Sequence, residues 1–300
     1  MARMTNTVKA VLLLAFGGPQ SMDEVEPFLR SLMEGRQVPD RQIEAVKERY
    51  RLIGGGSPLK SITAMQTQAL ESALNQSGPL YRVFTGMRYT EPSIEHAVEE
   101  IVSLGIHDLV ALPLSPYYNS ASTGKYLQRL EQSLAGTDLR VKLIKSYNTN
   151  PLFIKAVEQT ISVTVKDIED PFVIFSAHSL PVATAAADGY VEQLEQTLKL
   201  ILEDISFPSY ALAFQSRGMT GGDWLGPDVK DIMDRCARDN KKNIVVVPYG
   251  FVSDHVETLY DIDIVYKHYA GSLGLNFVRT PSLNTTELFI QALKDIVVKT

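Results

Sequence analysis

The chain has 300 residues, of which 45% are hydrophobic and 21% charged, and its formal net charge at pH 7 is −6. This composition is that of an ordinary globular protein, long enough for one large domain or two of average size. The negative charge, without a basic stripe, argues against nucleic-acid binding. The single cysteine, Cys236, excludes a disulfide framework and a four-cysteine metal cluster within the chain.

The N-terminal residues show no secretory signal. Residues 1–9 are short and polar, and the apolar run 10–16 has only the length of a strand. No segment approaches the roughly 20 apolar residues that span a bilayer. We therefore expect a cytoplasmic protein and leave peripheral contact with a membrane open.

In chain order, the first half alternates apolar runs with segments of helical periodicity. Residues 8–15 are a predicted strand, and Phe16-Gly17-Gly18-Pro19 form a tight turn at its carboxyl end. Ser57-Pro58 predict a helix start, because serine is a favourable N-cap and proline a favourable first-turn residue. The predicted elements of this half are strands at 8–15, 80–86, 108–114 and 140–144, and helices from 23, over 39–53, 57–74 and 93–104, and through Tyr126.

From Pro151 the same alternation begins again. The predicted elements are helices at 152–165, 190–205, 229–238, 255–273 and 285–299, and strands at 172–175, 210–214, 243–247 and 275–278. Alternating strands and helices predict doubly wound parallel sheets. Two rounds of four strands predict an α/β protein with two similar Rossmann-like domains, residues 1–150 and 151–300, and a cleft between them. No low-complexity linker separates the halves, so we expect them to pack closely.

His178 follows a predicted buried strand. The apolar residues 172–175 run into Ser176-Ala177-His178-Ser179-Leu180-Pro181. Ligands of open α/β sheets bind beyond the carboxyl ends of such strands, which places His178 where chemistry is expected. The alternative is a histidine that only caps the strand. A second stretch has the same design, with strand 243–247, a turn, and then Asp254, His255 and Glu257.

Glu257 and Asp261 are four residues apart on a predicted helix, so their carboxylates share a face. A cation or a shared proton would relieve their repulsion; the alternative is a solvated acidic face. Asp263 lies off that face and is expected to be structural. One imidazole and one carboxylate, those of His178 and Glu257, suit a divalent transition metal such as Fe(II). Two ligands make an open site that the metal can leave, and the imidazole can then take a proton.

Aromatic and glycine-rich segments offer candidate ligand contacts. Trp224 is flanked by glycines, which suits a loop-mounted wall for a flat ligand; the alternative is a structural anchor. Tyr50, Tyr89 and Tyr126 lie near predicted strand ends or helix starts. The triple glycine 54–56 lacks the spacing of a dinucleotide or P-loop motif. The helix that begins at Ser57 can still receive a carboxylate at its N-terminus; the alternative is a flexible turn.

Several motifs in this order resemble those of the ferrochelatases, which insert Fe(II) into a porphyrin to make haem. The resemblance covers nearly the whole chain and rests on residues 14–19, 50–58, 175–181, 215–216, 224–227 and 250–260. It implies a two-domain chelatase fold that holds the porphyrin in the cleft between the domains. It also implies that the enzyme bends the macrocycle toward the transition state.

The resemblance assigns roles to individual residues. His178 matches the histidine on the metal side, which also accepts a proton, and Glu257 matches its acidic partner. The residues expected to support this pair are Asp254, His255 and Asp261. The positions expected to contact the porphyrin are Phe16, Tyr50, Ser57, Arg88, Tyr89, Tyr126 and Trp224, with Ser57 placed to meet a propionate.

The chain departs from its relatives at several positions. Val265 stands where some relatives have a further carboxylate, and the family's Gly-Asp-Pro-Tyr appears only as Asp188-Gly189-Tyr190. There is no cysteine-rich tail, so we expect no iron–sulfur cluster and no permanently bound cofactor. Phe16, Leu29 and Met33 replace residues that tend to be polar in coproporphyrin enzymes. We expect them to form an apolar lip.

The expected partners are a porphyrin and ferrous iron. The apolar lip favours protoporphyrin IX over coproporphyrin III, and the same lip can rest on a membrane surface. Two alternatives remain open. One is a cobalt- or nickel-inserting chelatase on the same fold, and the other is a two-lobed porphyrin- or metal-binding protein without turnover.

Overall fold

The computed structural model describes residues 8–34, 36–76, 80–218 and 221–300. The first half of the chain forms a parallel sheet in the strand order β2-β1-β3-β4. Its elements are β1 (Lys9–Ala15), α1 (Met22–Leu32), α2 (Asp40–Leu52), α3 (Leu59–Leu74), β2 (Tyr81–Met87), α4 (Ile94–Ser103), β3 (Asp108–Pro113), α5 (Thr123–Ser133) and β4 (Arg140–Leu143).

The second half repeats this topology with the strand order β6-β5-β7-β8, again all parallel. Its elements are α6 (Pro151–Val165), β5 (Pro171–His178), α7 (Val182–Asp188), α8 (Tyr190–Asp204), β6 (Ser209–Gln215), α9 (Val229–Arg238), β7 (Asn243–Val247), η1 (Glu257–Tyr266), α10 (Lys267–Ser272), β8 (Asn276–Arg279) and α11 (Glu287–Lys299). The predicted α/β class with two similar doubly wound sheets is therefore confirmed.

The central strands are buried because their residues are apolar along almost their whole length. In β1 every residue after Lys9 is buried, and in β5 only the two end residues are not. Continuous apolar strands of this kind are covered by helices on both faces of a parallel sheet. The carboxyl ends of the strands are then the edge of each sheet where polar residues can gather.

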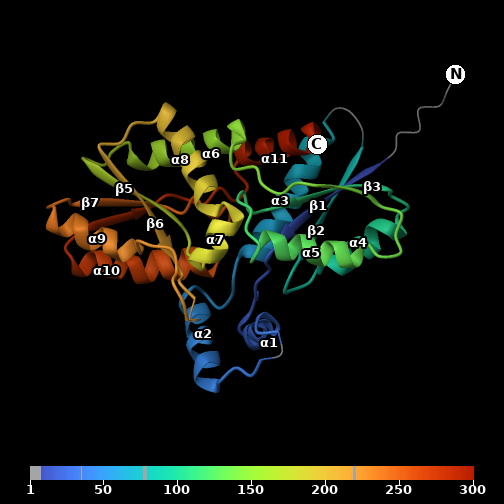
Figure 1. Cartoon of the computed structure of the whole chain (residues 1–300), viewed down its shortest axis with the longest axis horizontal. Coiled ribbons are helices and arrows are strands. Elements are labelled where there is room, and N and C mark those ends of the chain that lie inside the picture. The colour runs from blue at the N-terminus through green and yellow to red at the C-terminus, as the bar shows by residue number, and fades with distance from the viewer. Residues whose placement is uncertain (1–7, 35, 77–79, 219–220) are drawn as a thin grey trace.

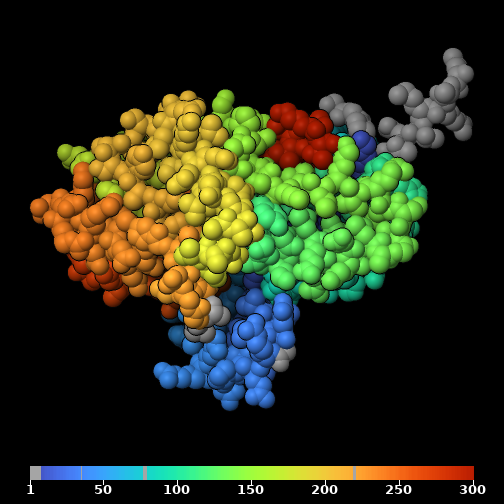
Figure 2. Space-filling model, in the orientation of Figure 1, coloured from blue at the N-terminus to red at the C-terminus, as the bar shows by residue number. Residues whose placement is uncertain are grey.

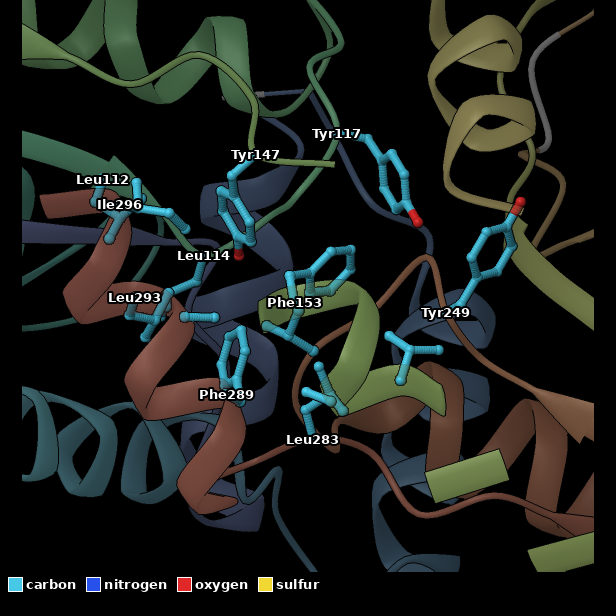
Figure 3. Packing of buried hydrophobic residues seen from close by; sticks show 14 of the residues in the cluster. Leu112, Leu114, Tyr117, Tyr147, Phe153, Tyr249, Leu283, Phe289, Leu293 and Ile296 are labelled. Atoms are coloured by element: carbon cyan, nitrogen blue, oxygen red, sulfur yellow. The ribbon is translucent and has the colours of Figure 1, made fainter. Parts of the chain in front are cut away.

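The two sheets lie side by side and share one hydrophobic core (Figure 1). The last helix, α11, packs against α3 of the first half as well as α6. Figure 3 shows Phe153 of α6 beside Phe289 and Leu293 of α11, all three fully buried. The halves therefore pack closely, as their missing linker predicts. Helices α1 and α2 project from this body as a separate lobe (Figure 2).

Two helical segments differ from the prediction. The expected single helix over 255–273 is instead a π-helix, η1, followed by α10. Helix α7, which follows the His178 loop, was not predicted, although its sequence Val-Ala-Thr-Ala-Ala-Ala-Asp is rich in strong helix formers. The predicted start of α3 is close to the observed one. Ser57 Oγ accepts the Leu59 amide hydrogen at 3.3 Å, and Pro58 already has helical backbone angles.

None of the described helices combines the length and the apolar character needed to cross a bilayer.

Candidate active site

His178 and Glu257 are positioned by two neighbouring strands of the second sheet, β5 and β7. His178 ends β5, and Glu257 begins η1 in the segment after β7, which pairs with β5 in parallel. Gly250 allows the loop after β7 to approach β5 closely, and its amide donates to Ser176 O at 3.2 Å. A Cβ at this position would lie 2.8 Å from Ala177 Cα, so a larger residue would push the loop away.

The two side chains face each other. His178 Nε2 lies 3.6 Å from Glu257 Oε1, and both residues are partly exposed. On the other side of the imidazole, Nδ1 lies 2.5 Å from the carbonyl oxygen of Ser179. Because a carbonyl can only accept, Nδ1 carries the hydrogen and donates it. In the neutral ring Nε2 is then unprotonated, so it can bind a metal or accept a proton on the side of Glu257.

Glu257 is held in its ionised form. Burial alone would raise its pKa, but the charges of His178 and His255 and its hydrogen bonds outweigh this effect and lower the pKa to about 2. Its Oε2 lies 3.8 Å from His255 Nε2 and has no hydrogen-bond partner among the described residues, although it is shielded from solvent. A buried carboxylate oxygen without a donor, beside two imidazole rings, suits a cation.

The pair does not form a closed metal cage. Within the described parts of the chain, no group of three or more His, Cys, Asp or Glu side chains is arranged to hold a metal ion. His178 and Glu257 therefore offer an open arrangement, suited to a metal that arrives and leaves as a substrate.

Gln215 and Ser216, at the end of β6, fix the backbone and side chains of η1. The buried Gln215 side chain donates to Glu257 O at 3.2 Å and accepts from Ser176 Oγ at 2.5 Å. Ser216 has a left-handed backbone, with φ of 57°, and its Oγ donates to Asp261 Oδ2 at 2.7 Å. Burial and the nearby Glu257 charge raise the pKa of Asp261. This is the electrostatic effect expected for two carboxylates on one helix face.

Asp254 and His255 occupy different positions around the pair. His255 Nδ1 lies 3.0 Å from Ser253 O, so its Nε2 is the nitrogen that faces Glu257. The Asp254 carboxylate instead accepts hydrogen bonds from Arg279, Ser282 and Asn284, away from His178. Burial raises its pKa, but these donors lower it overall. Asp254 therefore anchors the turn and does not contribute directly to the pair.

Four buried tyrosines lie within electrostatic reach of Glu257. Burial is the main cause of the raised pKa of Tyr50, Tyr126, Tyr190 and Tyr266, and the Glu257 charge adds to it in each case. Tyr50 and Tyr126 come from the first half of the chain, so both halves surround the pair. Tyr190 was not predicted; its hydroxyl donates to His178 O at 3.4 Å.

Phe16 and Tyr89 form an aromatic cluster with Phe28 of α1. The ring centroids of Phe16 and Tyr89 are 4.8 Å apart, and each ring is 6.3 Å from Phe28. Arg88 stacks over Tyr89, with 4.5 Å between its guanidinium carbon and the ring centre. Its nitrogens also reach Glu34 Oε1 at 3.1 Å and Ala121 O at 3.2 Å. Arg88 is therefore already paired within the protein.

Leu29 does not belong to the predicted apolar lip. It is 5% exposed and packs with Val38 and Ile43 in the small core of the projecting lobe. A leucine at helical spacing from Val25 and Leu32 fits a core position as well as a rim position, so the sequence pattern alone does not separate them. Met33 packs, partly buried, against the same core, and Phe16 lies with Phe28 and Tyr89.

Ser57 and Trp224, two of the predicted porphyrin contacts, are both held against neighbouring loops. Ser57 is buried, and a Cβ built on Gly18 would come within 3.3 Å of its side chain. Trp224 is partly buried, and its backbone pairs with Pro181 in the loop that follows His178. A Cβ on Gly218 would lie 2.4 Å from the Trp224 ring, so the backbone at Gly218 covers that part of the ring.

Gln66 was also missed by sequence reasoning. It lies on the apolar stripe of α3 between Ile62 and Leu70, and it is fully buried. Its side-chain amide donates to Ser253 Oγ at 2.9 Å and to Asn284 O at 2.7 Å. A polar residue within an apolar helical stripe is the signal that could have identified it.

The two sheets give the molecule the fold of the two-domain α/β chelatases. SirB from Bacillus subtilis, solved with Fe³⁺, superposes with a TM-score of 0.65 at 14% identity, covering 98% of this chain and 95% of its own. CbiX, the terminal enzyme of sirohaem biosynthesis in denitrifying bacteria, superposes with a TM-score of 0.60 at 10% identity, covering 97% and 99%. At these identities the likeness concerns the fold alone.

Sequence comparison identifies the family. The ferrochelatase family model matches residues 8–300. Ferrochelatases from Citrifermentans bemidjiense and Herpetosiphon aurantiacus are 36% and 38% identical to this chain, each over 96% of it and 97% of their own length. The ferrochelatase of Deinococcus radiodurans is 34% identical over 99% of this chain and 98% of its own. The chain belongs to the ferrochelatase family, and it is an enzyme that inserts a metal into a porphyrin.

Proposed function

We propose that this enzyme inserts Fe(II) into protoporphyrin IX to give protohaem, and that His178 and Glu257 carry the reaction. The observation that carries the proposal is the facing pair: His178 Nε2 lies 3.6 Å from the Glu257 carboxylate, whose pKa is held low by the neighbouring imidazoles. The family supplies the class of reaction, and the pair supplies groups that suit it.

Metal insertion requires a group that accepts protons. A divalent ion that enters a free-base porphyrin displaces two protons from pyrrole nitrogens. His178 Nε2 is the proposed acceptor for the two pyrrole protons in turn, releasing the first to solvent before it takes the second, since Nδ1 is occupied by its hydrogen bond to Ser179 O and the side chain is partly exposed. With a pKa of about 2, Glu257 is too weak a base to keep a proton at neutral pH. We assign it an electrostatic role: it binds the incoming cation and then stabilises the His178 imidazolium.

The porphyrin-facing positions favour an apolar substrate edge. Phe16, Phe28 and Tyr89 form an aromatic wall, which suits vinyl and methyl groups. Arg88 is engaged by Glu34 and the Ala121 carbonyl, so a further propionate would have to compete for it. Ser57, next to the N-terminus of α3, is the proposed propionate contact. These features support protoporphyrin IX over coproporphyrin III.

A side-by-side assay tests the choice of substrate. The enzyme is given Fe(II) without oxygen, with protoporphyrin IX or coproporphyrin III, and formation of the metalloporphyrin is followed by absorbance. We expect kcat/KM to be higher for protoporphyrin IX. A clear preference for coproporphyrin III would contradict the proposed substrate, and binding of both porphyrins without turnover would contradict the proposed activity. Competition with Co²⁺ and Ni²⁺ in the same assay tests the choice of metal.

Three further expectations remain predictions: cytoplasmic location, peripheral contact with a membrane, and the absence of a permanently bound cofactor. The proposed membrane contact is formed by the residues of the expected lip that stay partly exposed, Phe16 and Met33. Flotation with phospholipid vesicles tests it, and recovery of all the protein in the lipid-free fraction would contradict it.

A further inference from the structure

We propose that Arg279 is a positioning residue for metal insertion, which holds the π-helix η1 in the register that directs Glu257 toward His178. Arg279 lies at the end of β8 and forms no contact with His178 or Glu257 among the described residues. The proposal rests on the role proposed for Glu257 and names the residue that maintains its geometry.

Helix η1 needs support from outside the helix. π-Helices are rare, and most are single-turn bulges inside α-helices. Here the π register continues over ten residues, Glu257–Tyr266. The helix has no side-chain hydrogen bond at its N-cap, and Glu257 is its first residue. The position of this carboxylate therefore depends on what holds the turn before η1 and the body of η1 itself.

Arg279 contacts both of these segments. Its Nε donates to Asp263 Oδ1 at 2.7 Å, and its Nη2 donates to Asp263 Oδ2 at 2.9 Å. Together they form a bidentate ion pair with the middle of η1. Its Nη1 donates to Asp254 Oδ1 at 3.0 Å, three residues before Glu257. The Arg279 side chain is only 12% exposed, and the Asp254 carboxylate is 19% exposed, so the bond to the turn is largely shielded from water. One side chain thus joins the turn to the helix on either side of Glu257.

The two segments differ in their other attachments. Asp254 also accepts from Ser282 Oγ at 2.8 Å and Asn284 Nδ2 at 2.9 Å, so the turn remains anchored without Arg279. The Asp263 carboxylate has no hydrogen-bond partner other than Arg279 in the described ranges. Elsewhere in η1, Gln215 bonds the Glu257 carbonyl and Ser216 bonds Asp261, so the turn that carries Asp263 is the part most dependent on this arginine.

Loss of the bidentate ion pair between Arg279 and Asp263 should change the backbone hydrogen bonding of η1 without unfolding the rest of the protein. Without the ion pair between Arg279 and Asp263, the backbone hydrogen bonds of η1 can shift to the ordinary i→i+4 pattern of an α-helix. Each residue of an α-helix turns by about 100°, so a change of register redirects the side chains of the first turn. Glu257 would then leave its place opposite His178, while the porphyrin contacts in the first half of the chain would remain.

The test measures turnover and local structure in the full-length protein. In Arg279→Gln we expect kcat to fall about tenfold or more, with the KM for porphyrin within about twofold of wild type. Amide hydrogen exchange over residues 257–266 should accelerate, while exchange in β5 and β7 stays unchanged. Arg279→Lys keeps the positive charge but cannot form the bidentate ion pair, so its kcat and its exchange rates should lie between those of wild type and Arg279→Gln. Asp263→Asn should reproduce the effect from the helix side.

The matched control is Arg140→Gln. Arg140 makes the same two-pronged pair with Asp108, at 2.7 Å and 2.9 Å, on the outer strand of the first sheet. The Arg140→Gln variant should leave kcat and amide hydrogen exchange in η1 at wild-type values.

Unchanged exchange over 257–266 in Arg279→Gln and Asp263→Asn would overturn the proposal. So would acceleration equally throughout the chain, because that result indicates a general loss of stability. If Arg279→Gln does not fold, Asp263→Asn provides the test. The Asp263 side chain is 35% exposed, so we expect this variant to fold. A parallel Glu257→Gln variant separates the two hypotheses. If it keeps full activity, the role of Glu257 is wrong, whereas the exchange data still test the arginine alone.

Discussion

The reactivity of His178 depends on a hydrogen bond at the far side of its ring. The carbonyl of Ser179 fixes the proton on Nδ1, which leaves Nε2 free beside an ionised carboxylate. The sequence predicts His178 and Glu257 as candidates, because both follow apolar strands of a parallel sheet. It does not predict the tautomer of the imidazole, or that Glu257 Oε2 has no hydrogen-bond partner among the described residues, because these depend on side-chain rotamers and on neighbours distant in sequence.

Replacement of His178 tests this assignment at the level of one residue. In His178→Ala we expect kcat to fall by about 100-fold or more, the usual contribution of a general acid–base group. The melting temperature should change little, because the side chain is partly exposed at a strand end. Anaerobic metal insertion and thermal denaturation measure the two effects. His107→Ala removes an exposed histidine paired with Asp138 and serves as the control. Wild-type kcat in His178→Ala would refute the role.

At the level of elements, the site depends on how closely the loop after β7 approaches β5. The strands, most helices and their order follow from apolar periodicity, so they are predictable from sequence. The π register of η1 is not, because a helical pattern of apolar residues does not distinguish i→i+4 from i→i+5 hydrogen bonding. The supporting contacts of Gln215, Ser216 and Arg279 come from other strands and become visible only in the fold.

Gly250→Ala should damage both stability and activity. The added Cβ would meet the β5 backbone at Ala177, so the loop must shift, at a cost of about 1–3 kcal/mol in the free energy of unfolding. The same shift moves Glu257 from His178, so kcat should fall as well. Chemical denaturation and steady-state kinetics measure both. In Gly271→Ala, at an open position within α10, stability should stay equal or rise by about 0.5–1 kcal/mol. Equal behaviour of the two variants would contradict the packing argument.

Asp254 should make the stability of the turn dependent on pH. Its pKa in the folded protein lies below the ordinary value of 3.8, so ionised Asp254 stabilises the native state above that pH. This contribution is lost as the pH falls through the folded-state pKa. At pH 6, Asp254→Asn should be less stable than wild type by about 1–3 kcal/mol, and the gap should narrow toward pH 3.

Urea denaturation between pH 6 and pH 3 measures the stability gap for Asp254→Asn. The exposed substitution Asp239→Asn removes the same charge and should show no such narrowing. A gap for Asp254→Asn that is constant with pH would exclude its proposed linkage to protonation.

At the level of the whole molecule, two sheets of identical topology share one core, and both surround the same site. The last helix returns to pack on α3, so the end of the chain stabilises the first half as well as the second. The sequence predicts the repeated α/β pattern and the close packing. It does not predict the projecting lobe or the burial of Leu29, because an apolar stripe on a helix does not reveal which surface covers it.

Anomalous diffraction at the iron edge, from crystals exposed to Fe(II) without oxygen, tests the central claim most directly. The account predicts one strong peak within bonding distance of His178 Nε2 and the Glu257 carboxylate, and its loss in crystals of His178→Ala. An iron peak at other side chains, with His178 and Glu257 left unliganded, would contradict it.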